Sequence, residues 1–294
     1  MHTKLPFRNS PAVRLVVLFT LFFFFLLIAG GAGAALGQIG GLSTKATLLG
    51  SAAIQCIIAF CCPAWITARF SSDHPFVFTG LSGRISLRPF IGVVAVYILA
   101  MPAMNQLIAW NQAVHLPEWG SALETTLRTW EEQNGKVAQQ MLAGNGITGM
   151  LVSVLVVGLL TGFSEELFFR GGMQRIFTGL PISSATAVWV VAVIFSTMHF
   201  QFFGFIPRLI MGAFFGYLFV WTGSLWPSIF AHALNNSLVA VGAWLTGSVV
   251  SDGFDTLGVA QNGQFPYAAL GSAVATALFL WGFRNYFFKL NTRS

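Results

Sequence analysis

Six residues in the second half of the chain have types and spacings that could do chemistry together. They are Glu165, Glu166, Arg170, His199, His232 and Asn236. A carboxylate with an imidazole can activate a water molecule, and an imidazole with an amide can hold a negatively charged oxygen. All six lie in apolar segments, where an ionisable group costs about 2.5–3.5 kcal/mol at the centre of a membrane. Polar residues kept at such a cost are candidates for function.

The adjacent glutamates in "EELFFR" differ in the partners that a helix would give them. Glu166 and Arg170 are four residues apart with the acid first, the favourable order for an ion pair on one helix. Glu165 points about 100° away around the helix and has no such partner. An unpaired carboxylate in an apolar setting takes up a proton more readily, which suits a general base. The pattern indicates a structural Glu166 and a chemical Glu165, unless the stretch is the hydrated, interfacial end of a span.

Two further motifs each place polar residues four positions from a neighbour on the same helix face. "FSTMHF" puts His199 four residues after Phe195, and "HALNN" puts Asn236 four residues after His232. We expect Asn235 to face elsewhere. His232 and Asn236 could jointly hold a water molecule or an oxyanion. The alternative is that these side chains only pack or form hydrogen bonds between helices.

The composition identifies the setting as a membrane. Only 8% of the 294 residues are charged, 55% are hydrophobic, and the mean hydropathy is +0.74. Soluble domains carry about 25% charged residues, so this composition excludes an ordinary soluble domain. We expect an all-α polytopic membrane helix bundle, with residues 1–294 forming one domain. The three cysteines match no metal-binding spacing and are expected to pack as small apolar residues.

Long uncharged stretches predict eight spans, each near the roughly 20 residues that cross a bilayer. They cover 15–37, 46–68, 89–110, 147–170, 183–200, 206–222, 225–245 and 266–283. If the spans alternate in direction, one side receives Lys4, Arg8, Arg14, Arg69, Arg84, Arg88, Arg170, Arg175, Arg284, Lys289 and Arg293. The other side receives Lys45, Arg128, Lys136 and Arg208, together with Glu118, Glu124, Glu131, Glu132, Asp252 and Asp255. The positive-inside rule then places both termini in the cytoplasm.

Depth along the helices brings part of the candidate site together. If "TGLP" is the turn between the spans 147–170 and 183–200, Glu165 and His199 lie at similar depth, about 20–27 Å from it. The first of these spans must then be long and run past the membrane core. His232 comes out shallower, so tilt or kinking has to close the gap.

Two other segments have more than one reading. The stretch "RLVVLFTLFFFFLLIAGGAGA" could be a cleaved signal peptide, but its apolar run continues past the candidate cleavage site, so we expect an uncleaved first helix. Residues 116–144 place Leu123, Leu127 and Trp130 on one helix face, which predicts an amphipathic external helix. It could lie on the outer membrane surface, cover the bundle or bind a partner.

The three motifs, in this order on successive apolar segments, resemble those of the CAAX-protease and bacteriocin-processing (CPBP) family, which is related to the type II CAAX prenyl endopeptidases. "EELFFR" fits Glu-Glu-x-x-x-Arg, "FSTMH" fits Phe-x-x-x-His and "HALNN" fits His-x-x-x-Asn. The resemblance covers residues 163–237. It implies an intramembrane endopeptidase, in a bacterial plasma membrane, that hydrolyses a peptide bond in a membrane-associated protein or peptide. A nucleic acid is not expected as a partner.

The resemblance also implies roles for the site residues, which should line one cavity. Glu165 would activate the attacking water with help from His199, while His232 and Asn236 would stabilise the oxyanion. Glu166 and Arg170 would support the geometry. We expect a metal-free mechanism without a cofactor. The alternative is a zinc ion held by Glu165, His199 and His232, with water as the fourth ligand.

Three other functions fit parts of the pattern. The fold could serve as a non-catalytic immunity or scaffold protein, but the complete motif set favours activity. A proton-coupled transporter could use Glu and His as a relay, although the sequence shows neither inverted repeats nor a pair of broken helices. Haem ligation by His199 and His232 is a minor alternative.

The charge distribution makes a testable prediction about topology. Single cysteines placed at the two termini and in the 69–88 loop should react with an impermeant thiol reagent only from the cytoplasmic side. Cysteines in residues 116–144 should react only from outside. Labelling of 116–144 from the cytoplasmic side alone would overturn the orientation.

Overall fold

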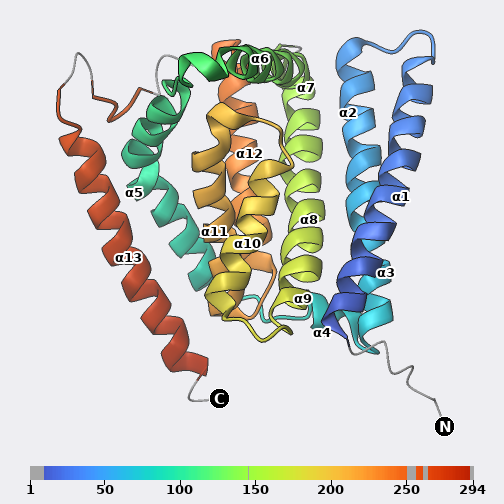
Figure 1. Ribbon diagram of the computed structural model, residues 1–294, viewed down its shortest axis with the longest axis vertical. Helices are drawn as coiled ribbons and strands as arrows, with labels where there is room; N and C mark the ends of the chain where they lie inside the picture. The colour runs from blue at the N-terminus through green and yellow to red at the C-terminus, as the bar shows by residue number, and fades with distance from the viewer. Residues whose placement is uncertain (1–9, 145, 250–255, 261–263, 292–294) are drawn as a thin grey trace.

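The computed structural model is a bundle of long helices (Figure 1). It describes residues 10–144, 146–249, 256–260 and 264–291, and no β-strand occurs within these ranges. Lys4, Arg8, Asp252, Asp255 and Arg293 therefore lie outside the described residues. The helices are α1 (Pro11–Gly37), α2 (Thr44–Ile54), η2 (Gln55–Cys61), α3 (Cys62–Ser71), α4 (Pro75–Thr79), α5 (Leu87–Gln112), η3 (Glu118–Gly120), α6 (Ser121–Leu142), α7 (Gly146–Ser153), η4 (Val154–Leu160), α8 (Thr161–Glu166), η5 (Leu167–Gln174), α9 (Arg175–Phe177), α10 (Ser184–Thr197), η6 (Phe202–Gly204), α11 (Phe205–Thr222), α12 (Trp226–Thr246) and α13 (Tyr267–Asn291).

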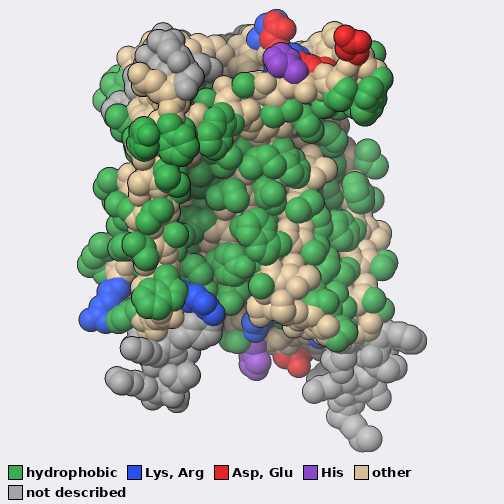
Figure 2. All heavy atoms as spheres, turned by 60° about the vertical axis from the view of Figure 1, so that its left-hand side comes forward, with side chains coloured by type: hydrophobic (Ala, Val, Ile, Leu, Met, Phe, Trp, Pro, Cys, Tyr) green, Lys and Arg blue, Asp and Glu red, His purple; other side chains and the backbone are tan. Residues whose placement is uncertain are grey.

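Each predicted span corresponds to one helix or one continuous helical run. Among the described residues, five runs are long and apolar enough to cross a membrane: Pro11–Gly37, Thr44–Ser71, Leu87–Gln112, Gly146–Phe177 and Phe202–Thr222. On the face that Figure 2 shows, hydrophobic side chains form a broad band, and charged side chains gather at the two ends. The chain is an integral membrane protein. The run Gly146–Phe177, with 32 residues, has the extra length that the depth argument required.

Helix α10 is shorter than the span predicted at 183–200, so the predicted end of that span is wrong. The helix ends at Thr197, and Phe200 then adopts a φ of 52°, which is outside the helical range. Its 14 residues rise about 21 Å, less than the roughly 30 Å of a hydrocarbon core. The connection to α11 is therefore expected at membrane depth. Irregular backbone is tolerated there only where it is buried in protein or lines a cavity.

A cluster of phenylalanines holds the first helices against the centre of the bundle. Phe22 of α1 and Phe60 of η2 both contact Phe168 of η5, with ring centroids 4.9 and 5.5 Å apart. On the other side of η5, Phe169 meets Phe195 of α10 edge to face at 5.1 Å. Lipid offers an apolar surface as well, so helices associate in a membrane mainly through close packing of this kind. The cluster places α1, η2 and α10 around the segment that carries the two glutamates.

Helix α6 is the predicted amphipathic helix, and it lies across one end of the bundle (Figure 1). The buried Lys45 Nζ of α2 donates to the carbonyls of Leu142 and Ala143, at 3.5 and 3.4 Å. The Gln139 amide bonds the carbonyl of Gly247 and the backbone N–H of Val249, both at 2.8 Å. These contacts support the covering alternative, because they fasten α6 to α2 and to the end of α12. Helix α1 begins and α13 ends at the opposite end of the bundle.

Glu124 fixes the start of α6 and gives it a pH dependence. Its carboxylate accepts hydrogen bonds from the backbone N–H of Leu116 at 2.7 Å and from Arg128 Nε at 2.8 Å. These hydrogen bonds lower the pKa of Glu124 from about 4.5 to about 2, and the bond from Leu116 has the largest effect. Because the folded-state pKa is depressed, the stabilisation is present above the unfolded value and is lost as the pH falls towards 2.

We expect wild type to exceed Glu124→Gln in thermal stability in detergent by a constant amount above about pH 5. The difference should shrink between about pH 4.5 and 2, over the interval between the unfolded and folded pKa values. Unfolding curves for both proteins across this range provide the measurement. A difference that does not change with pH would show that the carboxylate charge contributes nothing.

Candidate active site

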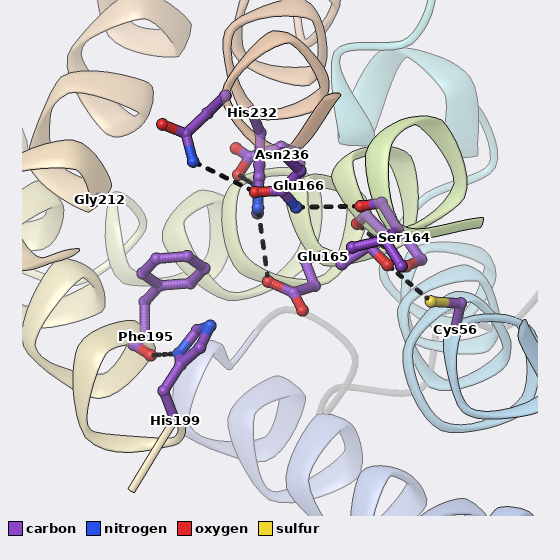
Figure 3. Close-up of polar contacts among 12 residues, drawn as sticks. Cys56, Ser164, Glu165, Glu166, Phe195, His199, Gly212, His232 and Asn236 are labelled. Atoms are coloured by element: carbon purple, nitrogen blue, oxygen red, sulfur yellow. Dashed lines mark hydrogen bonds and ion pairs between the residues drawn. The ribbon is translucent and has the colours of Figure 1, made fainter. Parts of the chain in front are cut away.

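Glu166 is the centre of a buried polar cluster that joins three parts of the bundle (Figure 3). Arg170 Nη1 donates to Glu166 Oε1 at 2.7 Å, and both side chains are fully buried. His232 Nδ1, from α12, meets the same oxygen at 2.8 Å. Arg170 Nη2 also donates to the carbonyl of Gly212 in α11, at 2.7 Å. The predicted ion pair is present, and it anchors two other helices.

Aromatic rings enclose this cluster. The Arg170 guanidinium carbon lies 4.8 Å from the ring centroid of Phe195 and 5.4 Å from that of Phe215. His232 stacks on Phe215, with centroids 5.0 Å apart and planes at 18°. Rings exclude water here, and the lower local dielectric strengthens the ionic hydrogen bonds. The same low dielectric makes the loss of one partner costly.

Whereas Glu166 is hydrogen-bonded at Oε1 and lacks a partner only at Oε2, Glu165 makes no hydrogen bond to a described residue. Its Oε2 is buried, and among the described residues it makes no hydrogen bond. His232 Nε2 lies 3.8 Å from this oxygen, which is too long for a hydrogen bond but suits a bridging water. The structure thus separates the two glutamates as the sequence predicted: one is paired within its own helix and the other is not.

Both histidines are oriented through Nδ1, which leaves Nε2 for chemistry. His199 Nδ1 donates to the carbonyl oxygen of Phe195 at 2.8 Å, and it thereby caps the end of α10. A carbonyl can only accept, so the neutral His199 ring carries its hydrogen on Nδ1 and has an acceptor at Nε2. His232 Nδ1 likewise faces a carboxylate oxygen of Glu166, and its Nε2 faces Glu165.

Two glycines explain how His232 comes so close to the glutamates. A Cβ at Gly162 would lie 2.8 Å from the backbone nitrogen of Ala233, and one at Gly158 would collide with Ser237 Oγ. Glycines spaced as G-x-x-x-G let two helix backbones approach closely in a membrane. The sequence analysis missed this pair, although "GLLTG" directly before the glutamates carried the signal. His232 lies beside both glutamates, 2.8 Å from Glu166 Oε1 and 3.8 Å from Glu165 Oε2, so the shallower position predicted for it is not observed.

Asn236 is tied to the neighbouring helix run as well as to the site. Its Nδ2 donates to the carbonyl of Val157 in the π-helical segment η4, at 3.1 Å. Asn235 Nδ2 donates to Asn236 Oδ1 at 3.2 Å, and both residues line one cavity. The expectation that Asn235 faces elsewhere was therefore wrong. The cavity extends around α12 far enough to meet two successive side chains.

Two cavities flank the candidate site, and His199 is the residue that lines both of them. One, of about 330 Å³, is lined by Phe195, His199, His232, Asn235 and Asn236 on one part of its wall. The other, of about 570 Å³, is lined by Glu165, His199 and mostly apolar side chains of α1, α2, η2 and α10. His199, His232 and Asn236 thus line the smaller cavity, and Glu165, in the wall of the larger one, lies 3.8 Å from His232 Nε2. His199 belongs to both cavities, whereas Glu165 lines only the apolar one.

A zinc site at Glu165, His199 and His232 requires the three side chains to converge on one ion. In the part of the chain that the structure describes, no group of three His, Cys, Asp or Glu side chains is arranged to hold a metal ion. The donor atoms themselves are of the right chemical type, since both imidazoles present Nε2 and the carboxylate presents an unpaired oxygen. The arrangement of the three side chains therefore does not fit a zinc ion.

Residues 147–238 match the family model described as "Type II CAAX prenyl endopeptidase Rce1-like". Comparison with curated proteins and with solved structures gives no match. The matched segment runs from α7 into α12 and contains all six candidate residues and both glycines of the close helix contact. It supports the family resemblance found from the motifs.

The buried Glu166–Arg170 pair predicts a specific pattern of stability changes. Glu166→Ala should destabilise the protein by about 3–5 kcal/mol, because it leaves a guanidinium buried without its counter-charge. The double variant Glu166→Gln with Arg170→Gln should recover part of the loss. Thermal unfolding in detergent measures both. A double variant no more stable than Glu166→Ala would show that the charges do not compensate each other.

Proposed function

Starting from the assignment of residues 147–238 to the type II CAAX prenyl endopeptidase family, we propose that the chain is an intramembrane endopeptidase with Glu165 as its general base. Its substrate is a membrane-associated protein or peptide. The observation that carries this proposal is the buried, unpaired Glu165 Oε2, 3.8 Å from His232 Nε2 and beside a cavity within the bundle. A base without a fixed hydrogen-bond partner is free to take a proton from water.

The first step is attack of water on the peptide carbonyl. Glu165 takes one proton from the water as the water oxygen forms a bond to the carbonyl carbon of the peptide. His199 accepts a second hydrogen bond from the same water through Nε2, because Phe195 holds the ring hydrogen at Nδ1. Glu165 then returns the proton to the leaving amine when the carbon–nitrogen bond breaks. Glu165 serves in both proton transfers, so its carboxyl group must not be held by another side chain between the first transfer and the second.

His232 and Asn236 stabilise the negative oxygen that forms in this step. In its protonated form, His232 donates from Nε2, while the Glu166 carboxylate at Nδ1 compensates the positive ring. Asn236 uses one amide hydrogen on the carbonyl of Val157 and keeps the other for the oxyanion. Donors fixed in this way are worth about 2.7–4 kcal/mol each in the transition state. Glu166 and Arg170 act through His232 as positioning residues.

We place both termini in the cytoplasm, on the basis of the charge distribution in the sequence. The helix ends support this orientation, since α1 begins and α13 ends at the end opposite α6 (Figure 1). The lipid bilayer supplies the substrate laterally, through the apolar side of the bundle that α1, α2 and α10 form around the larger cavity.

Glu165→Gln should keep the fold and lose the activity. The amide preserves the size of the side chain but cannot accept a proton, so cleavage should fall by about 10²–10⁴-fold while thermal stability stays equal or rises. The measurement uses proteoliposomes with a farnesylated Cys-aliphatic-aliphatic-X peptide and the same peptide without the lipid, with fragments identified by mass spectrometry. Wild-type activity should survive a chelator, and the purified protein should contain no stoichiometric zinc.

Equal cleavage by wild type and Glu165→Gln would exclude Glu165 as the base. Loss of activity in Glu166→Gln alone would mean that the two glutamates have exchanged roles. If folded wild-type protein cleaves neither peptide, the endopeptidase proposal fails for this class of substrate.

A further inference from the structure

Arg208 of α11 is a cation inside the bundle that the proposed mechanism does not use. Its Nη2 donates to Gln201 Oε1 at 2.7 Å, and its Nη1 donates to the carbonyl of Gly204 at 3.4 Å. Both partners are neutral. None of the ion pairs among the described residues includes Arg208. The guanidinium therefore has hydrogen bonds to fix its position but no carboxylate in contact.

Arg208 lines the smaller cavity together with the proposed oxyanion donors. The same wall contains His199, His232 and Asn236. Arg208 stands one helical turn before Gly212, whose carbonyl binds Arg170, and its charge acts on both His199 and Glu165. A group bound at Arg208 would thus share a cavity with the proposed oxyanion donors His232 and Asn236.

Glu131 of α6 is the acidic residue in this cavity wall, and it is committed elsewhere. Its Oε2 accepts the backbone N–H of Phe203 at 3.3 Å, in the short helix just before α11. It makes no ion pair with Arg208 within the described part of the chain. Glu131 interacts electrostatically with Arg208 but is not in contact with it, so the guanidinium can still bind an anion directly.

We propose that Arg208 binds a carboxylate of the substrate segment that occupies the smaller cavity, and so determines which peptides are cleaved. This rests on the proposed function. Arginine is suited to the task, because its planar guanidinium binds a carboxylate through two parallel hydrogen bonds. The cavity, at about 330 Å³, is at the lower end of ligand-pocket sizes and admits only a short segment of peptide.

The two cavities differ in polarity, and this difference determines which way the substrate peptide is oriented in the site. The larger cavity, about 570 Å³, is walled mainly by Phe19, Phe22, Phe60 and other apolar side chains, and it holds the membrane-anchored part. The smaller one holds the part that carries the carboxylate. His199 lies in the wall of both, at the crossing point. The carboxylate is either the C-terminus of the peptide or an acidic side chain near it.

Binding measurements on the full chain in detergent test the proposal without needing turnover. The protein carries Glu165→Gln, so that a bound peptide stays intact. The probe is a fluorescent peptide whose fourth residue from the C-terminus is a farnesylated cysteine. Three forms are compared: a free C-terminal carboxylate, a C-terminal amide, and a C-terminal amide with aspartate as the last residue. We expect the neutral amide to bind about ten- to a hundredfold more weakly than the free carboxylate. Recovery by aspartate would identify a side-chain carboxylate as an equivalent source.

Substitution of Arg208 should abolish this preference. Arg208→Gln should bind the three peptides equally, and Arg208→Lys, which keeps the charge but not the two-point geometry, should show an intermediate preference. Lys136→Gln is the control, because Lys136 pairs with Glu132 on the exposed face of α6, does not line this cavity, and should leave the preference unchanged. Glu131→Gln should increase the preference, because it removes a competing negative charge. Thermal unfolding verifies that each variant is folded.

Equal binding of the three peptides, or binding of none, would overturn the role of Arg208. The proposed function is judged separately, by cleavage with the Glu165 carboxylate present. Cleavage without a carboxylate preference would leave the endopeptidase standing and remove this inference. A carboxylate preference without cleavage would leave Arg208 as a carboxylate-binding residue and remove the endopeptidase function.

Discussion

A single carboxylate oxygen, Glu166 Oε1, holds the centre of this membrane protein together. It accepts from Arg170 on its own helix and lies 2.8 Å from His232 Nδ1, 66 residues away in the chain. A buried charge is tolerated only when it is paired and its hydrogen-bonding groups are engaged. The arrangement of α11 and α12 around the site therefore depends on this oxygen. The orientation of His232 follows from it, since the ring can turn only by giving up the carboxylate.

The glutamate beside it remains unpaired because of helical geometry. Successive residues point about 100° apart, so Glu165 cannot share the partners of Glu166. It faces the edge of an apolar cavity, while the polar cavity lies on the other side of His199. Two adjacent residues of identical type thus experience different surroundings: Glu166 is engaged at Oε1 by Arg170 and His232, and Glu165 makes no hydrogen bond to a described residue.

Features set by local spacing could be predicted from the sequence, and features set by tertiary contacts could not. The Glu166–Arg170 pair, the long run ending at Phe177 and the amphipathic α6 each follow from spacing along one helix. The place of His232 required the contact of Gly162 with Ala233, which spacing within α12 does not reveal. The early end of α10 depends on the turn at His199 and Phe200, within an otherwise uninterrupted apolar stretch. The accessibility of Asn235 depends on the extent of a cavity, which is a property of several helices.

The location of Arg170 on the same helix as Glu166 also bears on how the protein can be built. A polytopic chain enters the bilayer helix by helix, and His232 of α12 follows Glu166 of α8 by 66 positions in the chain. During that interval the glutamate would face lipid as a bare charge if its counterion came from a later helix. With the arginine one turn away, Glu166 enters the membrane already paired. The histidine then has only to join an existing pair, so insertion of the segment and assembly of the site are separate events.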